Sequence, residues 1–71
     1  MRDYRGAIAT QRQLLQQHPE SAKAPDALLN IATAQSDLGE LQAARTSLQE
    51  VIAKYPSSEA AAKARQRLGM R

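Results

Sequence analysis

The same proline-centred segment occurs twice in this chain, 37 residues apart. The first copy, QLLQQHPESAKA, covers residues 13–24, and the second, EVIAKYPSSEAA, covers residues 50–61. Because proline stops one helix and a serine can cap the next, the segment is typical of a joint between two helices. A chain that repeats such a joint is expected to stack similar helical units. The equivalent pairs are Leu14 and Val51, Leu15 and Ile52, His18 and Tyr55, Pro19 and Pro56, and Ser21 and Ser58.

The fold class is expected to be all-α. The chain is rich in Ala, Leu, Gln and Arg, which favour helices, and it has two tyrosines but no Phe or Trp. No segment shows the alternation of a half-buried strand. Pro19, Gly39, Pro56 and Gly69 interrupt the helical periodicity. The sequence therefore predicts four helices, at residues 3–17, 22–38, 41–54 and 58–68, with Ser58 as the N-cap of the last.

Helical spacing also predicts which side chains face the core. In the first helix these are Tyr4, Ala7, Gln11, Leu14, Leu15 and His18. In the second they are Leu28, Ile31, Ala32 and Leu38, and in the third Leu41, Ala44, Leu48, Val51, Ile52 and Tyr55. Two helices in a period of roughly 34 to 40 residues indicate a helix-turn-helix repeat, which buries its apolar face by stacking on a neighbour.

The sequence lacks a group of residues suited to catalysis, to a cofactor or to a metal. His18 is the only histidine, and as the equivalent of Tyr55 it is expected to form part of a helix end. There is no cysteine, and the three glycines are isolated, so neither a thiolate metal site nor a phosphate loop is predicted. No apolar run reaches the roughly 20 residues of a membrane span, and no signal-peptide pattern follows Met1. We expect no enzyme, no cofactor, no metal and no membrane insertion.

The net charge of +3 is placed at the C-terminal end. Lys63, Arg65, Arg67 and Arg71 occur there without an acid, whereas the preceding residues carry slightly more acids than bases. Such a cluster could neutralise phosphates, so nucleic-acid binding is one alternative. Two tyrosines offer little base stacking, and we therefore expect no nucleic-acid partner. A solvated face of the last helix and a surface for a protein partner are the other interpretations.

Residues 28–56 resemble a tetratricopeptide repeat. Gly39 closes one helix, Ala44 is small at the helix crossing, Leu48 follows one turn later, and Pro56 closes the next helix. Residues 21–68 also resemble the C-terminal repeat domain of the YbgF (CpoB) family of the Tol-Pal system, through KAPDALL, VIAKYPSSEAA and KARQRL. This resemblance divides the chain into the second helix of a truncated repeat at 3–19, one complete repeat at 24–57 and a capping helix at 58–71.

In stacked helix pairs the first helix of each pair lines the concave surface, where such repeats commonly hold a peptide or a partner helix. The core-facing stripe of the second helix leaves Leu29, Asn30, Thr33, Ser36 and Asp37 for that surface. The 37-residue shift matches Asp26, Leu29 and Asn30 with Lys63, Gln66 and Arg67 on the last helix. These nine residues are the predicted protein-binding site, with simple solvated surface as the alternative. Asn30 and Arg67 are the strongest candidates, since an amide can bond a peptide backbone and a guanidinium can clamp a carboxylate.

The YbgF resemblance implies a periplasmic protein that binds TolA and coordinates peptidoglycan synthesis with outer-membrane constriction in cell division. A tetratricopeptide adaptor in another pathway and a different periplasmic repeat lipoprotein stay open as alternatives. The resemblance also implies that the chain begins inside a repeat, so Tyr4, Ile8, Leu14 and Leu15 are expected to lack part of their normal cover. For that reason we also expect a homo-oligomer or an exchange of helices between chains.

Overall fold

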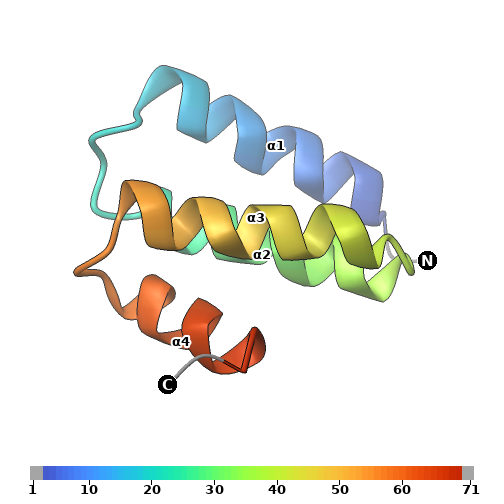
Figure 1. Ribbon diagram of the computed structural model, residues 1–71. Coiled ribbons are helices and arrows are strands. Elements are labelled where there is room, and N and C mark those ends of the chain that lie inside the picture. The colour runs from blue at the N-terminus through green and yellow to red at the C-terminus, as the bar shows by residue number, and fades with distance from the viewer. Residues whose placement is uncertain (1–2, 70–71) are drawn as a thin grey trace.

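The computed structural model describes residues 3–69, and within them the chain forms four α-helices (Figure 1). They are α1 (Tyr4–Gln17), α2 (Ala24–Asp37), α3 (Leu41–Lys54) and α4 (Glu59–Arg67). The predicted all-α fold class is confirmed, and the predicted bounds differ from the observed ones by at most two residues. The second helix begins later than predicted because the residues before it form a turn, in which the backbone N–H of Ala24 donates to the carbonyl of Ser21.

The two joints of the repeated segment have nearly the same backbone conformation. His18 ends α1 with φ −137° and ψ 61°, and Tyr55 ends α3 with φ −132° and ψ 59°. At each joint the backbone N–H of this residue donates to the carbonyl four residues earlier, Leu14 or Val51, over 2.8 Å. His18 is thus part of a helix end, as its equivalence with Tyr55 predicted.

Capping groups at the helix ends are those that the local sequence indicates. The Ser58 hydroxyl accepts a hydrogen bond from the backbone N–H of Ala61 at 3.0 Å, which confirms the predicted N-cap of α4. Gly39 follows α2 with φ 84°, and Gly69 follows α4 with φ 74°. At these values an L side chain would be strained, so glycine is suited to both positions, where the sequence predicted that a helix stops.

The helices α2 and α3 form a central pair, with α1 on one side and α4 on the other (Figure 1). α2 contacts all three other helices. The centre of the core is a cluster of nine buried apolar residues from α2, α3 and α4: Leu28, Leu29, Ile31, Ala32, Leu48, Val51, Ala60, Ala61 and Ala64. Three of its members are alanines of α4, whose small side chains allow that helix to approach the central pair closely.

A polar pair lies inside this packing. The Ser47 hydroxyl donates a 2.7 Å hydrogen bond to Oε1 of Gln35, and both side chains are buried between α2 and α3. Because a buried polar group needs a partner, this bond favours one register of the two helices over others.

Two predictions about which leucines are buried are wrong. Leu41 was expected to face the core, but it is 67% exposed, because α4 ends before it reaches the first turn of α3. Leu29 was expected on the surface, but it is only 7% exposed. α2 has neighbours on three sides, so its buried face is wider than one apolar stripe.

The first helix is the least covered. None of the residues from Tyr4 to Gln17 is buried, although Ile8 and Leu15 pack against the core. Ala7 and His18, which were expected to face the core, are exposed. Tyr4, Ile8, Leu14 and Leu15 are half-buried, as the expectation of incomplete cover predicted.

Candidate functional site

A polar stripe runs along the surface of α2. Asp26, Asn30 and Asp37 are exposed on this helix, and Thr33 is half-buried between them. Spacings of three and four residues place these four side chains on one face of the helix. The sequence predicted all four as surface positions, and three of them are freely accessible to a partner. Their role in binding stays a prediction.

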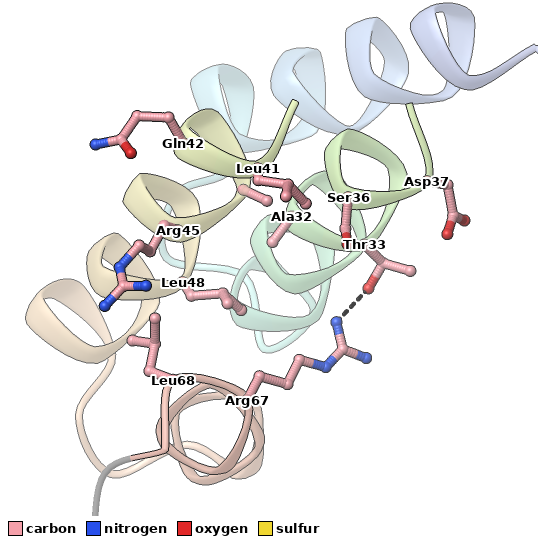
Figure 2. Close-up of a pocket in the computed structure, with 11 residues that line it drawn as sticks. Ala32, Thr33, Ser36, Asp37, Leu41, Gln42, Arg45, Leu48, Arg67 and Leu68 are labelled. Carbon is pink, nitrogen blue, oxygen red and sulfur yellow. Dashed lines mark hydrogen bonds between the residues drawn. The ribbon is translucent and has the colours of Figure 1, made fainter. Parts of the chain in front are cut away.

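Arg67 connects this stripe to α4. Its Nη1 donates a hydrogen bond to the hydroxyl oxygen of Thr33 over 2.5 Å, across 34 residues of sequence (Figure 2). The same hydroxyl donates to the backbone carbonyl of Leu29, which fixes the direction of its lone pairs. Lys63 and Gln66 of α4 are exposed as well. The structure therefore brings together Thr33 and Arg67, which were both predicted to lie on the binding surface, Thr33 from the helical stripe and Arg67 from the 37-residue shift.

Beside this contact lies a groove between α2, α3 and the end of α4, with a volume of about 600 Å³. Its lining combines side chains from all three helices (Figure 2). They are Ala32, Thr33, Ser36, Asp37, Leu41, Gln42, Ala44, Arg45, Leu48, Arg67 and Leu68. A groove of this size is within the range of ligand-binding clefts, which are roughly 300 to 1,000 Å³.

The groove has an apolar floor and a charged rim. Leu48 and Leu68 lie between Arg45 on one side and Arg67 on the other (Figure 2). Leu41 adds the most exposed large apolar side chain in the part of the chain that the structure describes. Apolar contacts next to guanidinium groups are suited to a protein segment that carries both hydrophobic and acidic residues.

Four of the nine predicted site residues line this groove, namely Thr33, Ser36, Asp37 and Arg67. Asp26, Asn30, Lys63 and Gln66 are exposed but do not line it. Leu29 is buried, so its assignment to the binding surface is corrected.

The sequence did not predict that α3 forms one wall of the groove. Leu41 and Leu48 were expected in the core, and no role was predicted for Arg45. Gly69 could have indicated this wall, because it marks the end of the last helix. A helix that stops there is too short to cover the beginning of α3.

The basic residues near the C-terminus do not act as one group. Both Nη atoms of Arg65 approach the carbonyl of Pro56, at 3.4 and 3.5 Å, whereas Arg67 bonds Thr33. Arg71, the last member of the predicted basic cluster, lies outside the described residues. Two of the guanidinium groups are thus oriented by contacts within the protein.

Within residues 3–69 there is no cluster of three His, Cys, Asp or Glu side chains that could hold a metal ion. None of the helices in this range is both long and apolar enough to cross a membrane.

Residues 26–58 match the tetratricopeptide repeat family. No curated protein and no solved structure gave a significant match. Repeats of this kind generally act as protein-binding modules, because stacked helix pairs present an extended surface. Residues 26–58 are thus similar to one tetratricopeptide repeat, and the four described helices form an all-α fold of the tetratricopeptide type.

Proposed function

We propose that this protein is a non-catalytic interaction module that holds a segment of a partner protein against the face shared by α2 and α4. The observation that carries this proposal is the contact between Arg67 and Thr33, which joins the polar stripe of α2 to the apolar groove. Polar groups along the stripe can bond a peptide backbone, and the groove offers apolar area beside them.

For the partner, we propose TolA, in a periplasmic role that links peptidoglycan synthesis to outer-membrane constriction during cell division. Support for this finer proposal comes from the segments KAPDALL, VIAKYPSSEAA and KARQRL, which resemble YbgF (CpoB). A tetratricopeptide adaptor in another pathway is the alternative, and it would use the same face for a different protein.

The test is a titration of the protein with purified TolA, in which binding is measured by calorimetry or fluorescence anisotropy. Asn30→Ala removes an exposed amide, and Arg67→Glu reverses the charge beside the groove. We expect Arg67→Glu to weaken binding on the order of tenfold or more, since a charge-assisted hydrogen bond contributes about 1.5 to 3 kcal/mol. Asn30→Ala should have a smaller effect in the same direction.

Arg12→Glu is the matched control, because Arg12 is an exposed arginine on α1 and its replacement changes the net charge by the same amount. Circular dichroism should show the same helix content for all variants. If both Asn30→Ala and Arg67→Glu bind TolA as the wild type does, the assignment of this face is wrong. If the wild type does not bind TolA at all, the finer proposal fails and the adaptor alternative takes its place.

A further inference from the structure

The groove lies where a longer α4 would pack. α4 has nine residues, whereas α2 and α3 have 14 each. In Figure 1, α4 covers only the half of the central pair that is next to the α3–α4 turn, and it stops before the α2–α3 turn. The uncovered half contains the groove, with Leu41 at 67% exposure.

The internal repeat indicates what kind of element covers such a surface. A shift of 37 residues places α1 (Tyr4–Gln17) on α3 (Leu41–Lys54) without a gap. The first half of α1 is covered by the second half of α2: Ile8 and Gln35 line one small cleft, and Arg5 forms a 3.2 Å ion pair with Glu40 just after that helix. By this equivalence we expect the corresponding surface on α3 to accept about two turns of a helix.

The chemistry of the two surfaces differs at one central position. Ile8 of α1 is replaced by Arg45 in α3. Among residues 3–69, the guanidinium of Arg45 makes no hydrogen bond or ion pair with another side chain or with a backbone carbonyl. A helix that covers α3 as α2 covers α1 would place the equivalent of Gln35 near this guanidinium. A carboxylate at that position would give Arg45 a partner, whereas a cation would be repelled.

We propose that the groove binds about two turns of an amphipathic helix from a partner protein, with a carboxylate directed at Arg45 and small or branched apolar residues on the floor. This inference rests on the proposed interaction function and specifies the chemistry of the partner. A second copy of this chain suits the groove less well, because the chain has a net charge of +3 and its least covered helix, α1, carries Arg5 and Arg12.

The probe is a pair of peptides with the sequence of residues 24–40, acetylated and amidated, that carry either Gln35→Glu or Gln35→Lys. Each is titrated at low salt into the wild-type protein and into Arg45→Glu, and the methyl resonances of Leu41, Leu48 and Leu68 are followed by NMR. We expect the glutamate peptide to bind the wild type about tenfold more tightly than the lysine peptide, and to shift these methyl signals. Arg45→Glu should invert the preference, and added salt should reduce it because the pair is exposed.

Arg12→Glu again serves as the control of equal charge change, and it should keep the wild-type preference. The proposal is overturned if neither peptide shifts the methyl signals, or if both peptides bind equally to the wild type and to Arg45→Glu. These outcomes are distinct from a failure of the proposed function. A TolA interaction that depends on Asn30 and Arg67 but not on Arg45 would leave the module intact and remove only the acidic-helix assignment.

Discussion

The buried hydrogen bond between Ser47 and Gln35 is expected to stabilise the packing of α2 against α3. Ser47→Ala removes the donor and leaves Oε1 of Gln35 without its 2.7 Å partner, in a side chain that is only 5% exposed. Since the two helices form two walls of the groove, their register also sets the shape of the candidate site. We therefore expect Ser47→Ala to lower the free energy of unfolding by more than the removal of one oxygen atom would suggest.

The magnitude follows from the asymmetry of buried hydrogen bonds. Leaving a buried acceptor without its donor lowers the stability of a protein by about 1 to 3 kcal/mol, whereas a formed hydrogen bond contributes about 0.5 to 1.5 kcal/mol net. Gln35→Leu should destabilise the protein less than Ser47→Ala does, because the remaining Ser47 hydroxyl can donate to the backbone carbonyl four residues earlier in α3. The double variant removes both polar groups and should be less destabilised than the sum of the two single changes. For a domain of this size, 1 kcal/mol corresponds to roughly 4 to 8 °C in Tm.

The assay is urea and thermal unfolding, followed by circular dichroism at 222 nm, for the wild type, both single variants and the double variant. Ser36→Ala is the matched control, since it removes an exposed hydroxyl from α2 and should change stability by less than about 0.5 kcal/mol. Two outcomes would contradict a stabilising role for this bond: Ser47→Ala is as stable as Ser36→Ala, or the effects of Ser47→Ala and Gln35→Leu add without a coupling energy.

Two further predictions concern the two ends of the helical stack. Ser58→Ala should destabilise the protein by about 1 kcal/mol through loss of the N-cap of α4, whereas Ser57→Ala one residue earlier should be nearly neutral; equal effects in urea unfolding would contradict this. Because no residue of α1 is buried, sedimentation equilibrium should show a mass above that of the monomer as concentration rises, and a strictly monomeric mass at high concentration would count against self-association.

The positions of the helices could be predicted from the sequence because they depend on local chemistry. Proline, glycine with positive φ and a serine cap act within a few residues, and each of them lies at or next to a helix end. The equivalence of His18 and Tyr55 could be predicted for the same reason, and their backbone angles agree within a few degrees.

Burial was less predictable, because it depends on how many neighbours an element has. Leu29 and Leu41 show this in opposite directions. Leu29 is covered because α2 lies between three other helices, and Leu41 is exposed because α4 ends before it could reach that side chain. Periodicity gives the angle of a side chain around its own helix, but not the width or the length of the surface that covers it.

The candidate site also has features that depend on local sequence and features that depend on how the helices pack. The four helices, the repeated joint and the polar face of α2 could be predicted from residue types alone, since they follow from backbone preferences and helical spacing. The packing of the helices was needed to show that Arg67 reaches Thr33, that Arg45 flanks the apolar floor, and that a groove opens beside the end of α4. These features depend on distances between side chains of different helices, such as Thr33 and Arg67, which are 34 residues apart in sequence, and such distances are set by the packing of whole helices against one another.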